Sequence, residues 1–522
     1  MFARKIDHYI CGAGLFALVS VTAVMPIWIY DYFWHLTAGR WIVDHRTLPV
    51  YDPLAVASAH VPWINGEWLY EVALAPLYAL VGHGGICLLN ALLTGAIFTL
   101  GYFLAGRQQD RGIALLAAAI AFAGGFYRLG VRPAVLGALL LVIALGLLTS
   151  RMSTVRLAVF YACLTVVWIN IHPSALLAPM LAAITMLSDV RRWIVAAASA
   201  VALLINPYGW NAVVAPMHLV SAIRSGAFIN VEWLPSSFEL YPIFYLTIAG
   251  AVALFLFVGD KRTNAWRLAV LILLAALAVR HVRNQGLYFA ALPLLLPPFR
   301  AFSRSVSNAI AAAGLIPIAW AFLQAEHRPG IDDVRLPVRA VSALRSAGLG
   351  GNIYSPDQFG GFIEWTFYPE RRALTDGRNE LFLDYIVNNA KARSDFEAWE
   401  SFLAQYQVTV ALEDYSGAGY KIGVNQRGSN EQRMIPRSLI LYHRRTWALI
   451  AFDDAAMVFA RRDAFAREQI AAMEYRYIVP DDPMIRFARP EIREAARAEV
   501  TRARQQFGDL EIVRKLERGV NQ

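Results

Sequence analysis

Residues 27–40 of the chain (IWIYDYFWHLTAGR) place a carboxylate and an imidazole directly behind an apolar segment. The apolar run that precedes them is about twenty residues long, which is close to the length of a bilayer-spanning helix. This run ends at Tyr30, and Asp31 and His35 follow it. An ionisable group at a membrane boundary is costly, so a function is the first interpretation. Asp31 also has a structural interpretation, because aspartate is a preferred cap of a following helix.

The composition divides the chain into two predicted domains. Of the 522 residues, 57% are hydrophobic and 17% are charged, whereas a soluble domain carries about 25% charged residues. The deficit lies in residues 1–325, where apolar runs recur. Their lengths predict a polytopic α-helical membrane domain of about eleven spans. Residues 326–522 are rich in Arg, Asp and Glu and long enough for their own core, which predicts a C-terminal mixed α/β domain.

The apolar runs define a predicted path through the membrane. The first span is assigned to residues 9–30 and a first outer loop to residues 31–83, and the later spans to residues 84–105, 112–126, 133–149, 157–171, 174–188, 192–206, 239–258, 266–280, 286–299 and 306–324. Within the first loop, residues 66–82 are amphipathic, which predicts a helix along the membrane surface. A competing path counts residues 68–81 as a full span and inverts every later loop.

Pairs of basic residues in the short loops predict the orientation. Cytoplasmic loops are enriched in Lys and Arg, and pairs such as Arg107/Arg111 and Arg191/Arg192 all fall on one side of the preferred path. This places the N-terminus in the cytoplasm and the C-terminal domain outside, which in a bacterium is the periplasmic side of the inner membrane. The net charge of +9 is explained by these pairs and does not indicate a nucleic-acid partner. The three cysteines lie in apolar runs, which argues against a disulfide framework.

On this path the unusual polar residues collect on the outer face of the membrane. They are Asp31, His35, Asp52 and Glu67 in the first loop, Arg128 and Arg132 in the second, Asn170 and His172 in the third, Glu232 in the fourth, and Arg280, Arg283 and Asn284 in the fifth. Acids and bases gathered on one face of a helical bundle are typical of a reaction chamber. Structural interpretations stay open for three of them: Arg280 can cap a helix end, Asp52 can be an N-cap, and His172 can begin a helix.

Local patterns predict several elements of the C-terminal domain. Strands are expected in residues 348–355 and 408–414, a hairpin in residues 447–461 with its turn at Asp453 and Asp454, and an amphipathic helix in residues 396–407. Residues 489–519 predict an exposed helix. The glycine-rich stretch 357–365 (DQFGGFIEW) lacks the spacing of a phosphate-binding loop. Asp376, Gly377 and Arg378 form either a simple turn or a contact to an acceptor.

Several segments carry a family resemblance. They are residues 31–72 (DYFWHLTAGRWIVDHRTLPVYDPLAVASAHVPWINGEWLYEV), 131–136 (VRPAVL), 168–174 (WINIHPS), 205–211 (INPYGWN), 231–238 (VEWLPSSF), 280–293 (RHVRNQGLYFAALP) and 354–382 (YSPDQFGGFIEWTFYPERRALTDGRNELF). The chain resembles the GT-C superfamily of integral-membrane glycosyltransferases, which use polyprenyl-phosphate-linked sugars. Within it, the chain is most similar to a bacterial branch related to the protein mannosyltransferases.

The resemblance implies sugar transfer from a polyprenyl-phosphate lipid to a glycan, lipid or protein acceptor at the outer face of the membrane. It also implies an aspartate at the outer end of the first span, which is Asp31 here. Two departures stand out. Many GT-C enzymes have a second acid beside this aspartate, where this chain has Tyr32, and residues 65–69 (NGEWL) replace a proline-rich stretch.

The chemistry of such a transfer assigns roles to the outer residues. A carboxylate can act as general base for the acceptor hydroxyl, and we expect Asp31 in this role, with Glu67 or Asp52 as second carboxylate. Arginine forks can stabilise the leaving phosphate, and Arg283 and Arg280 are the first candidates, followed by Arg128 and Arg132. The residues expected to shape the chamber are His35, Asn170, His172, Glu232 and Asn284. Asp31, His35 and Glu67 could also ligate a divalent metal, although no tight ligand spacing supports one.

Two other classes of function remain open. A GT-C-like scaffold without activity would hold partners in a larger complex, and Tyr32 at the position of the second acid favours this alternative. A flippase for lipid-linked glycans would bury ionisable residues at mid-membrane and show repeated halves. The chain shows no evident internal repeat, and the centres of its predicted spans are almost free of charge.

Overall fold

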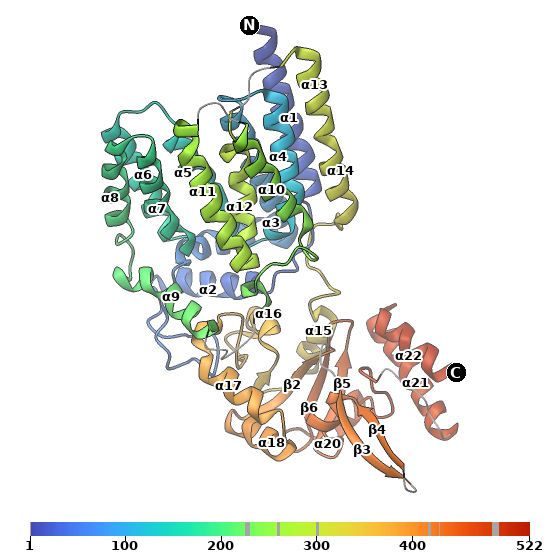
Figure 1. The fold of residues 1–522 in the computed structure, drawn as a ribbon. Coiled ribbons are helices and arrows are strands. Elements are labelled where there is room, and N and C mark those ends of the chain that lie inside the picture. The colour runs from blue at the N-terminus through green and yellow to red at the C-terminus, as the bar shows by residue number, and fades with distance from the viewer. Residues whose placement is uncertain are drawn as a thin grey trace. The chain divides into compact units, whose positions relative to one another are not determined.

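The computed structural model describes residues 2–224, 230–257, 261–298, 302–415, 419–426, 429–482 and 490–521 (Figure 1). The chain forms two compact units, and each is described by itself. Unit 1 comprises Met1–Ile29, Ile42–Leu48 and Ile64–Gly330, and unit 2 comprises Tyr30–Trp41, Pro49–Trp63 and Ile331–Gln522. Two pieces of the predicted first outer loop therefore belong to the same unit as the C-terminal part of the chain.

All named elements in the described residues of unit 1 are helices. Its α-helices are α1 (Phe2–Thr22), α3 (Trp68–Ala105), α4 (Arg111–Gly125), α5 (Pro133–Leu148), α6 (Thr154–Ile169), α7 (Leu177–Ile184), α8 (Trp193–Ala202), α9 (Trp210–Arg224), α10 (Pro242–Leu256), α11 (Lys261–Arg280), α12 (Gln285–Leu295), α13 (Arg304–Ala313) and α14 (Leu315–Gln324). Short 3-10 helices connect them: η1 (Phe126–Arg128), η2 (Pro173–Leu176), η3 (Thr185–Leu187), η4 (Val190–Arg192), η5 (Val231–Trp233) and η6 (Val282–Asn284).

Three helical segments in the described residues are long and apolar enough to cross a membrane. They are Trp68–Ala105, Thr263–Arg280 and Arg304–Gln324. Shorter apolar helices lie at Ile6–Thr22, Pro133–Leu148, Thr154–Ile169, Pro173–Leu187 and Pro242–Leu256. The prediction of a helical membrane protein is confirmed by these apolar helices, whereas the count of about eleven spans remains a prediction.

Helix α3 is broken at Gly82. With 38 residues, a straight helix would be about 57 Å long at about 1.5 Å per residue, well beyond the ~30 Å hydrocarbon core. Gly82 has φ 63° and ψ −175°, a conformation that glycine adopts without the steric cost of a side chain. The break separates residues 68–81 from the span expected at 84–105. Both predicted paths place a boundary here, so the choice between them remains open.

The first predicted span ends earlier than the sequence suggested. Helix α1 stops at Thr22, and residues 23–30 continue without regular helix. Pro26 disfavours helical geometry in the residue before it, and the N–H of Ile27 donates to the carbonyl of Gly330 at 2.8 Å. The prediction that Asp31 directly ends the first span is therefore wrong. Asp31 is instead the first residue of α2 (Asp31–His45).

Small residues let the helices of unit 1 approach closely. Helix α4 packs against α12 and α3, and its buried residues include a series of alanines. A Cβ added at Gly124 or Gly125 would lie 2.3 or 2.8 Å from atoms of Phe289 on α12. Close approach through small residues is the usual way in which membrane helices pack, because the lipid offers no hydrophobic drive between them.

Unit 2 contains a small mixed sheet with the strand order β1-β2-β6-β5. Strand β1 (Asn352–Tyr354) is parallel to β2 (Val408–Asp414), whereas β6 (Ala456–Arg461) is antiparallel to both β2 and β5 (Trp447–Phe452). A separate hairpin joins β3 (Tyr420–Gln426) and β4 (Ser429–Ile435). The helices are α2, α15 (Val338–Ala347), α16 (Asp357–Phe367), η7 (Asn379–Leu381), α17 (Leu383–Ala392), α18 (Phe396–Gln405), α19 (Arg437–Leu441), α20 (Arg467–Met473), α21 (Pro490–Phe507) and α22 (Glu511–Asn521).

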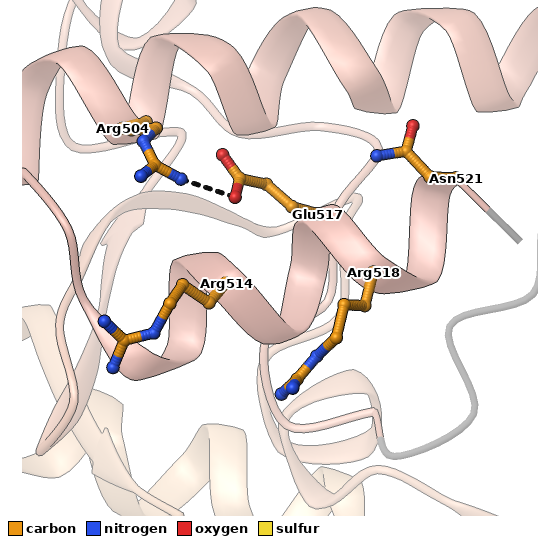
Figure 2. Close-up of a pocket in the computed structure, with 5 residues that line it drawn as sticks. All are labelled: Arg504, Arg514, Glu517, Arg518 and Asn521. Carbon is orange, nitrogen blue, oxygen red and sulfur yellow. Dashed lines mark hydrogen bonds and ion pairs between the residues drawn. The ribbon is translucent and has the colours of Figure 1, made fainter.

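The predicted C-terminal elements are largely confirmed. The strands in residues 348–355 and 408–414, the β5–β6 hairpin and helix α18 all form where local patterns placed them. The single exposed helix expected in residues 489–519 is instead two helices, because Gly508 has φ 83° and ends α21. Each helix buries one face. Between them lies an open hollow of about 530 Å³, lined by Arg504, Arg514, Glu517, Arg518 and Asn521 (Figure 2).

Asp453 connects the β5–β6 turn to helix α15. Its Oδ1 accepts hydrogen bonds from the N–H groups of Ala455 and Ala456 at 3.0 and 2.9 Å. Its Oδ2 accepts from the N–H groups of Arg339 and Ala340, in the first turn of α15, at 3.0 and 2.9 Å. The side chain is fully buried, so these four donors depend on one carboxylate.

We expect Asp453→Ala to lower the free energy of unfolding by about 2–4 kcal/mol, because it leaves buried backbone donors without an acceptor. The measurement is denaturant unfolding of the purified full-length protein. Asp463→Ala is the matched control, because the Asp463 side chain is 66% exposed and pairs only at the surface with Arg461. Equal stability of the two variants would contradict a structural role for Asp453.

Candidate functional site

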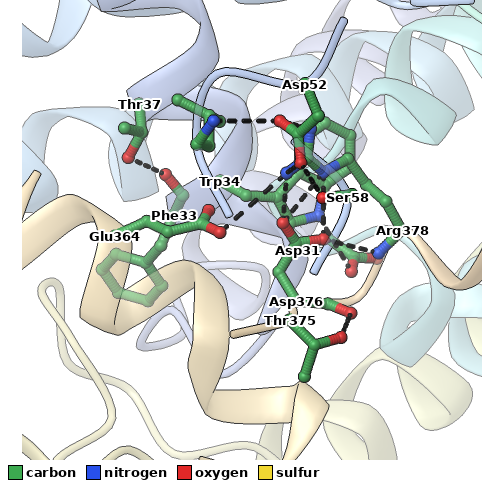
Figure 3. Close-up of polar contacts among 11 residues, drawn as sticks. Asp31, Phe33, Trp34, Thr37, Asp52, Ser58, Glu364, Thr375, Asp376 and Arg378 are labelled. Atoms are coloured by element: carbon green, nitrogen blue, oxygen red, sulfur yellow. Dashed lines mark hydrogen bonds and ion pairs between the residues drawn. The ribbon is translucent and has the colours of Figure 1, made fainter. Parts of the chain in front are cut away.

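A buried cluster of charged residues in unit 2 is centred on Arg378. Its Nη1 and Nη2 donate to Oδ1 and Oδ2 of Asp52 at 3.0 and 3.1 Å, and its Nε donates to both Asp376 oxygens at 2.9 Å (Figure 3). The guanidinium carbon lies 4.4 Å from the ring centroid of Trp63 and 5.3 Å from that of Trp34. Arg378 is only 2% exposed. Two carboxylates and two indole rings therefore hold this arginine in one orientation.

Asp52 has further partners besides Arg378. Its Oδ1 also accepts from the N–H of Leu54 at 3.0 Å, and its Oδ2 accepts from the hydroxyl of Ser58. The carboxylate is buried. These contacts favour a role for Asp52 in holding Arg378, and its expected role as second catalytic carboxylate remains a prediction.

Glu364 adds a third carboxyl group to this cluster. It is fully buried on α16, and its Oε1 lies 3.9 Å from Nη2 of Arg378. Burial and then the negative charge of Asp376 raise the pKa of Glu364 well above its ordinary value, and the attraction of Arg378 does not offset them. The carboxyl group of Glu364 is therefore shifted toward its protonated form, because it faces Asp376 and Asp52 as well as Arg378.

Two glycines of α16 allow the cluster to assemble. A Cβ at Gly360 would lie 1.7 Å from the carbonyl oxygen of Thr375, and a Cβ at Gly361 would lie 3.0 Å from the backbone nitrogen of Trp34. The glycine pair in the stretch DQFGGFIEW therefore lets α16 touch both the segment before Arg378 and the first turn of α2. The role of this glycine pair was not predicted from the sequence.

Backbone hydrogen bonds tie the first-loop residues of unit 2 to the same segment. The N–H groups of Val56 and Ala57 donate to the carbonyls of Ala373 and Leu374 at 3.0 and 3.1 Å. The N–H of Leu374 in turn donates to the carbonyl of Ile353 in β1 at 3.2 Å. The segment that carries Asp376 and Arg378 is thus held between strand β1 and residues that lie more than three hundred positions earlier in the chain.

Asp31 lies beside this cluster as the first residue of α2. Its Oδ1 accepts a hydrogen bond from Nε1 of Trp34 at 3.3 Å, and a Cβ added at Gly377 would lie 2.5 Å from the same oxygen. The helix N-terminus favours negative charge at this position. Asp31 is half-buried. His35, one turn further along α2, is buried with its ring centroid 3.6 Å from that of Trp34, and its chamber role remains a prediction.

A second polar cluster lies in unit 1 and contains four of the predicted residues. Nη1 of Arg132 donates to both Glu232 oxygens at 2.8 and 3.0 Å, and Nη1 of Arg128 lies 3.9 Å from Oε1 of Glu232. Nη2 of Arg128 donates to the hydroxyl of Tyr241 at 3.1 Å. Burial opposes the ionisation of Glu232, but Arg132, Arg283 and Arg128 outweigh it and lower its pKa to about 2.

Arg283 joins this cluster from the segment after α11. Its guanidinium carbon lies 4.6 Å from the ring centroid of Trp233, the residue that follows Glu232. We call Arg128, Arg132, Glu232 and Arg283 the arginine cluster. Its three guanidinium groups share one carboxylate, so these four residues carry a formal charge of +2. This charge and the fork geometry of arginine suit a phosphate group.

Two other predicted residues have different surroundings. Arg280 is exposed at the last residue of α11, and no contact within the described residues places it in the arginine cluster. Nδ2 of Asn284 donates to the carbonyl of Leu277 at 3.1 Å, which satisfies an acceptor near the end of α11. These contacts are those of a helix end, and the proposed functions of both residues remain predictions.

A third group of predicted residues in unit 1 contains Glu67 and His172. Nε2 of His172 lies 3.9 Å from Oε1 of Glu67. The N–H of Ser174 donates to Nδ1 of His172 at 3.1 Å, so the proton of the neutral ring lies on Nε2, toward Glu67. The structural interpretation of His172 is confirmed, because this hydrogen bond makes it the N-cap of η2.

Asn170 holds this third group together. Its Oδ1 accepts from Nε1 of Trp68 at 2.9 Å, and its Nδ2 donates to the carbonyls of Val166 and Ile205 at 2.7 and 3.0 Å. The residue is buried. These contacts join α6 to the start of α3 and to the turn after α8, so Asn170 positions the backbone around Glu67.

The residues suggested as metal ligands are not brought together as a set. Within the described part of the chain, no group of three or more His, Cys, Asp or Glu side chains is arranged to hold a metal ion. Asp31 and His35 belong to unit 2, whereas Glu67 belongs to unit 1. We therefore derive no chemical step through a metal.

The fold is similar to that of known structures. The archaeal oligosaccharyltransferase AglB from Archaeoglobus fulgidus, solved in complex with an inhibitory peptide and a dolichol-phosphate, superimposes with a TM-score of 0.56 at 10% identity, over 80% of this chain and 70% of that chain. The apo form of the Archaeoglobus fulgidus oligosaccharyltransferase gives a TM-score of 0.55 at 11% identity, over 78% and 69% of the two chains.

A third structure of that oligosaccharyltransferase, tethered to an acceptor peptide containing the NVT sequon, gives a TM-score of 0.55 at 10% identity, over 77% of this chain and 69% of that chain. No family model and no curated protein matches the sequence. At such low identity the likeness concerns the fold. The expected resemblance is confirmed at that level: the chain has a fold similar to that of a GT-C glycosyltransferase.

Proposed function

We propose that the protein transfers a sugar from a polyprenyl-phosphate-linked donor to an acceptor at the outer face of the bacterial inner membrane. The observation that carries this proposal is the likeness of fold to an oligosaccharyltransferase whose structure contains a dolichol-phosphate. Fold alone does not define activity. The proposal therefore also relies on a basic cluster that suits a lipid phosphate and on a carboxylate that suits an acceptor hydroxyl.

The arginine cluster is the proposed site of the donor phosphate. When the bond between the sugar and the phosphate breaks, the phosphate keeps the electron pair and gains negative charge. Preorganised guanidinium groups stabilise such charge without reorganising during the reaction. Glu232 is ionised and fixes Arg132 by two hydrogen bonds, while Arg128 and Arg283 approach the same carboxylate from η1 and η6.

Asp31 is the proposed general base. It takes the proton of the acceptor hydroxyl as the acceptor oxygen forms its bond to the anomeric carbon, and the lipid phosphate leaves. Glu67 is the better second carboxylate, because the imidazole of His172 lies 3.9 Å from its Oε1, whereas the Asp52 carboxylate is engaged by Arg378. Proton transfer by a positioned carboxylate contributes about 10²–10⁴-fold to the rate of such a reaction.

We expect Asp31→Asn to reduce sugar transfer at least ~100-fold, because the amide cannot accept the proton. The assay uses the purified full-length protein in liposomes with radiolabelled polyprenyl-phosphate sugars extracted from the native membranes. Asp44→Asn is the control, since Asp44 is exposed on the same helix. Full activity of Asp31→Asn would remove Asp31 from the mechanism.

Arg283→Ala should raise the KM for the lipid donor by about 10–100-fold, because one charge-assisted hydrogen bond contributes about 1.5–3 kcal/mol. Arg280→Ala provides the comparison, since Arg280 lies at the exposed end of α11. The KM is measured by titrating the donor lipid in the same liposome assay. If Arg280→Ala weakens donor use as much as Arg283→Ala does, the phosphate does not lie in the arginine cluster.

A scaffold without activity is the second candidate function, and one observation favours it. Tyr32 occupies the position of the second acid and is fully buried against Phe33 in an edge-to-face contact, so it serves packing. A scaffold predicts that Asp31→Asn complements a deletion strain as well as the wild-type protein does. A flippase, in contrast, would translocate the donor lipid without transferring its sugar.

A further inference from the structure

The loop Asp376-Gly377-Arg378 packs directly against Asp31 through the backbone of Gly377. The Cβ that any other residue would add at position 377 points at the carboxylate, 2.5 Å from Oδ1 of Asp31 and 3.7 Å from Nε1 of Trp34. A Cβ at less than 3.0 Å is essentially never found against another heavy atom, so only glycine fits without a shift of the carboxylate. The backbone of Gly377 therefore forms one wall of the Asp31 site.

Trp34 forms a second contact and connects Asp31 to Arg378. Its indole N–H donates to Oδ1 of Asp31 at 3.3 Å, while its ring lies 5.3 Å from the Arg378 guanidinium. Arg378 itself is immobile, because Asp52 and Asp376 engage its donors. The indole that contacts Asp31 is thus held in place by a buried ion-pair network.

We propose that Gly377, Trp34 and Arg378 are positioning residues that fix the carboxylate of Asp31 in the orientation needed for proton abstraction. This inference rests on the proposed function, because it assigns these residues to the same transfer reaction. Trp34 orients one carboxylate oxygen, Gly377 limits the rotation of the side chain, and Arg378 holds both the indole and the loop. Asp52 and Asp376 act through Arg378.

The arrangement fits the chemical requirement of a general base. A base must lie within hydrogen-bond reach of the proton that it abstracts, and a misplacement of about 1 Å can lower a rate about 100-fold. An aspartate at the start of a helix can rotate about its side-chain bonds unless neighbouring groups restrict it. Catalytic groups are most effective when a supporting shell of packed side chains fixes them.

Other charged groups face Asp31 from the elements around it. They are Asp357 from α16, Asp376 and Arg378 from the loop, and Glu380 from η7. Loss of solvent, together with Asp376 and Asp31, raises the pKa of Asp357, and loss of solvent raises that of Glu380, with Asp376 and Asp31 adding to the rise and Arg378 opposing it. Trp34 contributes a neutral donor among these charges, so its replacement alters the hydrogen bonding of Asp31 without adding or removing a charge.

The first experiment compares Gly377→Ala with Gly350→Ala. A Cβ at Gly350 meets no atom within 4 Å, so this control should transfer sugar at the wild-type rate. Gly377→Ala should lower kcat about 10–100-fold with an unchanged KM for the lipid donor, since the donor site is in unit 1. The probe is the same mixture of radiolabelled polyprenyl-phosphate sugars in liposomes. A wild-type kcat for Gly377→Ala would overturn the proposal.

The second experiment uses Trp34→Phe, which keeps an aromatic ring beside Arg378 and removes the N–H that contacts Asp31. Losing a donor to the ionised carboxylate raises the pKa of the base, so the acidic limb of the kcat profile should move to higher pH. A purely structural role would lower the amount of folded protein without moving this limb. This measurement also decides the proposal if Gly377→Ala does not fold, because an unmoved limb would overturn it.

Different results would contradict the assignment of Asp31 as general base and the positioning role of its neighbours. If Asp31→Asn is fully active, the assignment of the general base fails and the positioning role fails with it. If Asp31→Asn is inactive while Gly377→Ala and Trp34→Phe both behave as the wild-type protein, only the positioning role fails. Arg378→Lys adds a third test, because lysine keeps the charge and loses the fork; it should lower kcat and leave the donor KM unchanged.

Discussion

The ion pairs of Arg378 with Asp52 and Asp376 are the constraint on which the organisation of unit 2 depends. Burying each of these charges costs several kcal/mol, and only good geometry with additional hydrogen bonds offsets that cost. Here the guanidinium donors are divided between two carboxylates, and the guanidinium carbon lies 4.4 Å from the ring centroid of Trp63 and 5.3 Å from that of Trp34. Removing one partner of such a pair typically costs about 3–5 kcal/mol, because the remaining charge stays buried. These ion pairs therefore hold residues that are far apart in the sequence, such as Asp52 and Arg378, next to each other.

The surroundings of Glu364 favour its protonated form in this cluster. Three ionised carboxylates around one arginine would leave two uncompensated negative charges in a buried site, where such charges are least tolerated. Burial and Asp376 instead raise the pKa of Glu364, which shifts this group toward its neutral form and so reduces the cost of that excess. The surroundings of Asp31 on the neighbouring helix differ, since it starts α2 and accepts an indole N–H. Two carboxyl groups of the same unit thus lie in different environments.

Local sequence patterns predicted the secondary-structure elements, which depend on neighbouring residues. They did not predict the contacts between residues that are distant in the sequence. Short segments were sufficient to predict strands β2, β5 and β6, which are buried almost throughout, and the amphipathic helix α18. Asp52 and Arg378, in contrast, are separated by 326 positions, and no local pattern pairs them. The glycine pair Gly360-Gly361 was the available signal, since adjacent glycines in a helix are unfavourable unless something must approach closely. Pro26 was the available signal that helix α1 ends before Tyr30, because proline disfavours helical geometry in the residue before it.

The two halves of the proposed reaction need opposite environments, and the two polar clusters, one in each unit, differ in charge. A leaving phosphate needs excess positive charge, and the arginine cluster supplies it because Glu232 neutralises only one of three guanidinium groups. The proposed general base needs an ionised carboxylate that is held in position. The donors of Arg378 reach Asp52 and Asp376, and the indole N–H of Trp34 donates to Asp31. In the proposed mechanism the buried ion pairs would therefore do more than stabilise the fold, because a fixed Arg378 would in turn hold the indole that donates to Asp31.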